Sequence, residues 1–117
     1  MKRVTIPIAT ITDGSCTAYG DSCVGVLYAV QLEDGDLADG VDITLTAENE
    51  QGSIPLLAQL NFNTDQMQYP RVLQTLNTDG TALATHCEPV IFGRLKLVVA
   101  QGGAVKTGSV TCFIREI

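Results

Sequence analysis

The C-terminal stretch RLKLVVAQGGAVKTGSVTCFIREI, Arg94–Ile117, alternates apolar and polar residues on both sides of a glycine pair. Successive side chains of a strand point to opposite faces, so Leu95, Leu97 and Val99 would share one face. The residues after the glycines alternate in the same way. Gly102-Gly103 is a hairpin turn signal, because glycine adopts positive φ without steric cost. We therefore expect a C-terminal β-hairpin that completes a β-sandwich.

The same period of two runs through most of the remaining chain. The clearest half-buried strand is Val41–Glu48, whose apolar residues fall on alternate positions. Cys23–Leu32 is apolar enough for a central strand, whereas Asp13–Ser22 is rich in turn formers and predicts a loop. Val4–Ile8 also alternates, but Pro7 cannot donate a hydrogen bond to a neighbouring strand. This run therefore predicts an edge strand or a bulge.

Two segments in the middle of the chain are less regular. Ile54–Phe62 fits either a strand or a short helical turn across one end of the sheet. Asn61–Pro89 has only short apolar patches between turn signals, and a connection of about 25 residues is long for a compact domain. We expect an excursion at 61–89 that packs on the domain or forms an arm that reaches a neighbour.

The chain as a whole predicts one all-β domain spanning 1–117. A length of 117 residues is enough for one hydrophobic core, and an apolar content of 45% is too high for a disordered chain. No long window has the period of a helix. About six to eight short strands with turns between them are typical of a single-domain antiparallel β-sandwich or a jelly-roll-like barrel.

The charge and hydropathy of the chain exclude two classes of partner. A net charge of −6 with scattered Lys and Arg argues against nucleic acid, because phosphate neutralisation needs clustered cations. No apolar run approaches the roughly 20 residues that span a bilayer. The opening MKRVTIPIATIT is interrupted by threonines and a proline, so it does not predict a signal peptide. We expect no nucleic acid and no membrane as partner, and synthesis in a cytoplasm.

The four cysteines, Cys16, Cys23, Cys87 and Cys112, form no CxxC pair. His86 lies beside Cys87, but adjacent residues of a strand point to opposite faces and cannot easily serve one site. Free thiols are the favoured interpretation in a cytoplasm. One disulfide, or a metal or catalytic role, remains an alternative, and the sequence does not settle any pairing.

The loop EDGDLADG gathers four acids, Glu33, Asp34, Asp36 and Asp39. Converging carboxylates in one loop can bind Ca²⁺, but the glycines are wrongly placed for an EF-hand and no glutamate closes the loop. A solvated turn between two strands needs the same composition, and we favour the turn. No metal site is expected.

Signals of catalysis are weak throughout the chain. There is one histidine and no G-x-S-x-G elbow, so a serine hydrolase is not indicated. QGGAVKTGS, Gln101–Ser109, lacks the spacing of a phosphate-binding P-loop and joins one predicted strand to another. No carboxylate is marked as desolvated for acid–base work. We predict no catalytic residue and no cofactor, and hence no enzyme.

Tyr69-Pro70-Arg71 lies inside the irregular excursion. A tyrosine and an arginine that flank a proline have the composition of an interface anchor. The alternative is a packed loop with an ordinary surface arginine. The candidate interface residues are therefore Tyr69, Pro70 and Arg71.

Three segments in the same order, Lys2–Thr10 (KRVTIPIAT), Tyr69–Arg71 (YPR) and Arg94–Val110 (RLKLVVAQGGAVKTGSV), resemble small proteins encoded among the virion genes of tailed bacteriophages and prophages. They cover about a quarter of the chain. The resemblance implies a β-rich virion structural protein with no catalytic residues to carry over. It favours a capsid decoration or cement protein, whose partners would be the major capsid protein and copies of itself in a homo-oligomer.

Two other functions remain open. The same fold can serve in the neck, tail or fibre of a virion. Independently of the resemblance, the acidic loop allows a calcium- or carbohydrate-binding β-sandwich.

Overall fold

The computed structural model describes residues 1–75 and 80–116, with side chains for all of these except 73–75 and 82–84. The described residues form strands and turns and no helix, and in this part of the chain no helix could cross a membrane. The predicted all-β class is confirmed. The strands are β1 (Lys2–Ala9), β2 (Cys16–Glu33), β3 (Val41–Asn49), β4 (Gly52–Phe62), β5 (Gln66–Gln68), β6 (Val72–Thr75), β7 (Ala82–Cys87), β8 (Val90–Ala100) and β9 (Thr107–Glu116).

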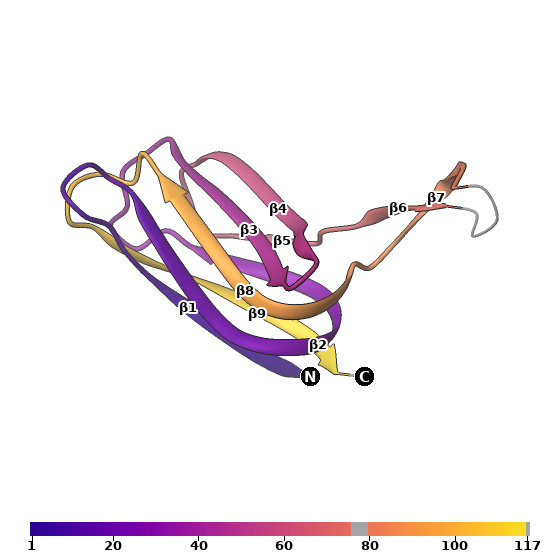
Figure 1. The fold of residues 1–117 in the computed structure, drawn as a ribbon. Helices are drawn as coiled ribbons and strands as arrows, with labels where there is room; N and C mark the ends of the chain where they lie inside the picture. The colour runs from indigo at the N-terminus through magenta and orange to yellow at the C-terminus, as the bar shows by residue number, and fades with distance from the viewer. Residues whose placement is uncertain (76–79, 117) are drawn as a thin grey trace.

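The main sheet is antiparallel and has seven strands in the order β1-β9-β2-β8-β3-β4, with β5 also on β2. Strand β2 is 18 residues long and pairs with different strands along its two halves. It pairs with β8 over Cys16–Val26 and with β9 over Gly25–Glu33. Around β2 the sheet folds over into two layers, with β1 and β9 in one and β8, β3 and β4 in the other (Figure 1). This arrangement is the predicted β-sandwich.

Both layers contribute to a single core. The alternation expected for 94–117 is confirmed for the described strand residues, because Leu95, Leu97 and Val99 of β8 and Val110, Cys112 and Ile114 of β9 are buried, whereas residue 117 lies outside the described residues. Phe62 at the end of β4 is the largest fully buried side chain. The fully buried members from the strands of the two layers include Ile6, Ile8, Leu27, Leu32, Ile43, Leu45, Ile91, Leu95, Leu97 and Ile114.

The predicted C-terminal hairpin is wrong, although its two strands exist. Strands β8 and β9 do not pair with each other, because β8 pairs with β2 and β3 while β9 pairs with β1 and β2. The connection 101–106 instead crosses from one layer to the other. Gly102 donates its N–H to the carbonyl of Gly14 (2.8 Å) and accepts from the N–H of Ala38 (3.0 Å). The glycine pair does mark a turn. Which strands β8 and β9 pair with is decided by the need to bury one face of each of them.

The predicted loop Asp13–Ser22 is also too long. The turn ends at Ser15, and β2 begins at Cys16. Thr17 and Tyr19 pair with Val98 and Lys96 of β8, and a register shift follows Tyr19. Pairing in the sheet therefore overrides the turn propensity of these residues, which appears only as a local irregularity.

Prolines lie in both outermost strands of the main sheet. The prediction that Pro7 marks an edge strand is confirmed, since β1 is at one end of the order. Ile54–Phe62, which fitted a strand or a helical turn, lies within β4 at the other end, and β4 carries Pro55. A proline offers no N–H, so both edges are poor templates for adding a strand from another chain.

The excursion predicted at 61–89 begins later, because Asn61 and Phe62 end β4 and Phe62 is buried in the core. The chain then leaves the body after a short contact with it. Strand β5 pairs with β2, and β6 and β7 then form a separate two-stranded sheet. Figure 1 shows these two strands, which we call the arm (described residues 72–75 and 80–87), pointing away from the body. The part of the predicted excursion at 76–79 lies outside the described residues. The radius of gyration is 14.8 Å, whereas about 13 Å is typical of a compact chain of this length. The arm, which projects from the body, is the reason that the radius of gyration is larger than that of a compact chain.

We predict that Leu97→Ala lowers the free energy of unfolding by about 2–5 kcal/mol, because Leu97 is fully buried and its truncation leaves a cavity. Val98→Ala is the matched control, since its side chain is exposed on the opposite face of the same strand and should change stability by about 0.5 kcal/mol or less. Chemical unfolding of both variants measures the difference. Equal losses would contradict the assigned inward face of β8.

Candidate interaction site at the base of the arm

The predicted interface residues lie where the chain passes from β5 into the arm. Tyr69 has 55% of its surface exposed, and Arg71 is also exposed. Pro70 between them is half-buried. The three residues are therefore at the surface of the body, at the point where the arm begins.

Tyr28 of β2 is the centre of this site. Its ring meets the ring of Tyr69 edge to face, with centroids 6.1 Å apart and planes at 82°. The guanidinium of Arg71 lies 5.9 Å from the Tyr28 ring centroid, and its Nη1 donates to the carbonyl oxygens of Tyr28 (3.1 Å) and Pro70 (2.7 Å). Backbone acceptors and the two tyrosine rings together fix the strand that enters the arm.

The strand that leaves the arm is fixed on the same side of the body. Glu88, which follows β7, pairs with Arg115 of β9. Arg115 also lies 5.9 Å from the ring centroid of Tyr28. The carbonyl of Pro89 accepts a hydrogen bond from the N–H of Leu27 (3.0 Å). Both ends of the arm are thus attached around one residue, Tyr28.

Sequence reasoning did not find Tyr28, Glu88 or Arg115. These residues lie far from Tyr69–Arg71 along the chain, and only the pairing of β2 with β9 brings them together. The one available signal was the outward position of Tyr28, which alternates with buried neighbours in β2.

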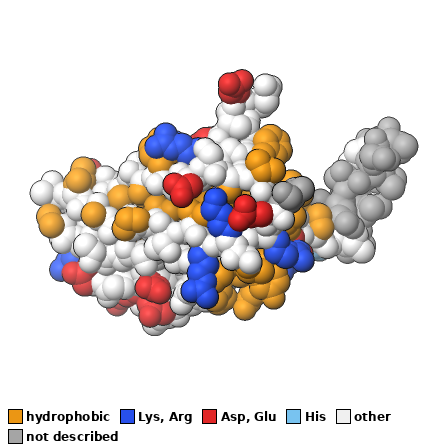
Figure 2. Space-filling model, turned by 90° about the horizontal axis from the view of Figure 1, so that it is seen from below, with side chains coloured by type: hydrophobic (Ala, Val, Ile, Leu, Met, Phe, Trp, Pro, Cys, Tyr) orange, Lys and Arg blue, Asp and Glu red, His pale blue; other side chains and the backbone are white. Residues whose placement is uncertain are grey.

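Exposed apolar side chains continue the site along the outer face of β2 and β8. Val24 lies opposite Phe92 in the register of these strands, and Val26 lies opposite Val90. Val24, Val90 and Phe92 each expose half of their surface or more. Figure 2 shows apolar side chains with Lys and Arg beside them at the end of the body from which the arm leaves. We call the following set the root surface: Val24, Tyr28, Tyr69, Arg71, Val90, Phe92 and Arg115.

The root surface combines apolar area, aromatic rings and cations. Within the described residues, no carboxylate forms an ion pair with Arg71, whereas Arg115 is paired with Glu88. Contacts of a guanidinium with a tyrosine ring contribute about 0.5–1 kcal/mol at exposed sites. Tyr and Arg are also the residue types that dominate binding energy in protein interfaces. The arrangement is suited to binding another protein surface.

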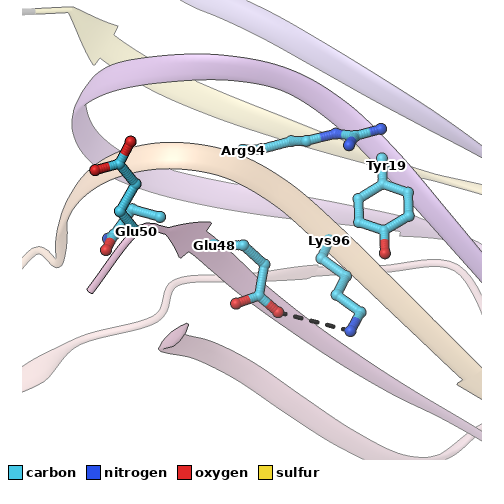
Figure 3. A pocket seen from close by; sticks show the side chains of 6 residues that line it. Tyr19, Glu48, Glu50, Arg94 and Lys96 are labelled. Carbon is cyan, nitrogen blue, oxygen red and sulfur yellow. Dashed lines mark ion pairs between the residues drawn. The ribbon is translucent and has the colours of Figure 1, made fainter. Parts of the chain in front are cut away.

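A second cluster lines an open hollow of about 440 Å³ near the β3–β4 turn. The guanidinium of Arg94 lies 3.9 Å from the ring centroid of Tyr19, and Lys96 Nζ lies 3.7 Å from Glu48 Oε1. Figure 3 shows Glu48 turned toward Lys96 and Glu50 pointing away from this pair. The hydrogen bond from Ser53 is the main reason that the pKa of Glu48 is lowered. A general acid needs a raised pKa, so Glu48 is unsuited to that role.

The acidic loop is built as a turn between β2 and β3. Asp36 Oδ1 accepts hydrogen bonds from the N–H (2.6 Å) and the hydroxyl (3.2 Å) of Thr107, and Asp65 Oδ1 accepts from the N–H of Asp34 (2.8 Å). Burial, and then the charges of Asp39, Asp65 and Asp36, raise the pKa of Asp34. Across residues 1–75 and 80–116, no three His, Cys, Asp or Glu side chains are placed to hold a metal ion.

The four cysteines are free thiols in this structure. Cys112 lies in the core, where burial raises its pKa to about 12, so it stays protonated and unreactive. Burial also raises the pKa of Cys23. His86 is exposed on β7 beside the half-buried Cys87.

Comparison with known proteins gives no relative: no family model, no curated protein and no solved structure matches the chain.

We predict that Asp34→Asn stabilises the protein near neutral pH. A carboxyl with a pKa raised above its ordinary value of 3.8 makes an unfavourable contribution to folding once it is ionised. The gain should therefore disappear as the pH falls below that value, which chemical unfolding at several pH values measures.

Asp36→Asn is the control, and its effect on stability should have the opposite sign. The hydrogen bonds from Thr107 lower the pKa of Asp36, so its carboxylate stabilises the fold above the ordinary value of 3.8. This stabilisation is lost as the pH falls through the lowered pKa. Asp36→Asn should therefore destabilise the protein near neutral pH, and the same sign for both variants would contradict the assigned geometry.

Proposed function

We propose that the chain is a phage virion structural protein with no catalytic activity, and that it serves as a capsid decoration, or cement, protein on the head lattice. The observation that carries this proposal is the root surface, an exposed set of aromatic, apolar and cationic side chains where a two-stranded arm leaves a packed body. Its partners would be the major capsid protein and further copies of the chain.

The arm itself supports a binding role. A two-stranded hairpin without a third strand or a covering layer is marginally stable in water. Strands β6 and β7 pair with each other and not with the main sheet. The surface of a partner protein would supply the missing layer. The body needs no such help, because its core is closed.

The resemblance of Lys2–Thr10, Tyr69–Arg71 and Arg94–Val110 to virion proteins supports the choice of a phage particle. The mechanism would be mass action: a protein that binds only the assembled lattice stabilises it in proportion to its affinity and occupancy. Many weak sites on a symmetric shell add to a large effect, so a small domain without a catalytic centre is sufficient for the task.

The geometry favours this role over a calcium- or carbohydrate-binding module. The acidic loop uses its carboxylates as acceptors for its own backbone and for Thr107. In the hollow, one face of Tyr19 is covered by Arg94 at 3.9 Å, so that face is not free for a sugar ring. We therefore do not propose either ligand.

We expect this chain to be present in purified particles at a copy number comparable to that of the major shell protein. Quantitative mass spectrometry of virions gives the ratio. A copy number that fits a single ring would assign the protein to the neck, tail or fibre instead. Absence from particles would refute both virion roles.

We expect Tyr69→Ala with Arg71→Ala to weaken binding to empty shells by about thirtyfold or more, because truncating an interface anchor costs about 2 kcal/mol or more. Tyr19→Ala with Arg94→Ala is the matched control, since it removes an exposed tyrosine–arginine pair that is not part of the root surface. Co-sedimentation with shells measures both variants, and thermal unfolding confirms that each is folded. Equal binding of the two variants would exclude the root surface as the contact.

A further inference from the structure

The charges of the chain are divided between the two ends of the body. The loops 10–15, 34–40 and 101–106 meet at one end, which we call the loop end, and are joined by hydrogen bonds such as Gly102–Gly14 and Ala38–Gly102. The N-terminus, the end of β9 and the arm lie at the other end (Figure 1). Seven of the thirteen acidic side chains are on the loop end, with Lys106 as the one basic side chain among the residues described there: Asp13, Glu33, Asp34, Asp36, Asp39, Asp42 and Asp65.

The acidic charges of the loop end are held in place and repel one another. Asp36 is fixed by Thr107, and Asp65 by the N–H of Asp34. The raised pKa of Asp34 reflects burial and the nearby charges of Asp39, Asp65 and Asp36. Cations brought to this end would reduce the repulsion.

The root surface offers the complementary charge at the opposite end. Arg71 has no carboxylate partner within the described residues, whereas Arg115 beside it is paired with Glu88. Strand β8 runs between the two ends and has 11 residues, which at about 3.3 Å per residue is roughly 35 Å. This length is several times the Debye length of about 8 Å at physiological salt. The two ends therefore act on a partner as separate charged surfaces.

Two geometries of self-association can be compared. A twofold contact through the root surface would place Arg71 near Arg71 of the other copy, which like-charge repulsion disfavours. A twofold contact through the loop ends would place acid against acid. Pairing along the sheet edges is disfavoured by Pro7 and Pro55. Only a contact between the loop end of one copy and the root surface of the next joins opposite charges.

We propose that copies of this chain associate head to tail, with the acidic loop end of one copy bound to the root surface of the next. Such a contact uses two different surfaces and repeats from copy to copy, so it generates a ring if the rotation closes and a filament if it does not. It also covers the exposed Val24, Val90 and Phe92. The proposal names a second copy of the chain as a further partner of the root surface, besides the shell, and rests on the interaction role proposed above.

The test uses the purified full-length chain alone, in analytical ultracentrifugation over a range of protein and salt concentrations. Wild-type protein should form species larger than a monomer at low salt and dissociate as salt is added. Arg71→Glu and Asp39→Lys should each weaken association by about tenfold or more, because each places like charges in the contact. Asp39 suits this test, since it is exposed on the loop end.

Charge exchange makes the test specific. Arg71→Glu combined with Asp39→Lys in one chain should restore association, because the lysine introduced at position 39 of one copy then meets the glutamate introduced at position 71 of the next. An equimolar mixture of the two single variants should also associate, since each single variant retains one native surface and the two altered surfaces are complementary in charge. Arg3→Glu changes the net charge as Arg71→Glu does, but on the other layer of the body, and should leave association unchanged.

A monomer under all conditions, or single variants that associate like the wild type, would refute the head-to-tail contact. So would failure of the double variant to recover while both single variants remain folded. If the purified protein is monomeric but shell binding still requires Tyr69 and Arg71, the root surface binds the shell and only the proposed self-association is wrong. If the purified protein is monomeric and shell binding does not require Tyr69 and Arg71, the proposed function is refuted as well.

Discussion

Strand β2 pairs with β8 along its first half and with β9 along its second half, and this shared strand joins the two layers of the protein. Gly25 lies where the two ladders overlap. A Cβ at this position would collide with the carbonyl oxygen of Arg115, so the close approach of β9 requires glycine here. The layers converge on either side of this point, and their alternating side chains close one core.

The attachment of the arm depends on the same strand. Beyond the overlap, β2 presents Tyr28 outward, and Leu27 binds the carbonyl of Pro89 through its N–H. Arg71 reaches Tyr28 from the entering strand, and Arg115 reaches it from β9. The site therefore forms only after β2, β8 and β9 are correctly paired. A surface built on paired strands is also more precisely held than one built on a loop.

The electrostatic division of the molecule follows from the direction of the strands. In an antiparallel sandwich the connections gather at two ends, and here the turn that carries Glu33, Asp34, Asp36 and Asp39 falls at one of them. The arm, the N-terminus and the end of β9, with the cations of the root surface, lie at the other end. Although the net charge is −6, the acids and the cations are concentrated at different ends of the molecule. Such a charge distribution favours association in one orientation.

The sequence by itself determined that strands form and which residues they bury. The alternation in 94–117 and in Val41–Glu48 could be recognised locally because the period of side chains along a strand is two. Pro7 likewise indicated an edge, since a missing N–H is a local property. The Tyr69-Pro70-Arg71 motif was recognisable from its composition, and it does lie at the surface of the body.

Only the tertiary structure decided which strands pair and which side chains meet. The glycine turn after β8 is compatible with a hairpin or with a crossing between layers, and burial of both faces against one core selected the crossing. In the same way, Tyr28, Glu88 and Arg115 lie far apart along the chain and meet Arg71 only through strand pairing. Such contacts carry no local signal, because their free energy comes from surfaces that exist only once the chain has folded.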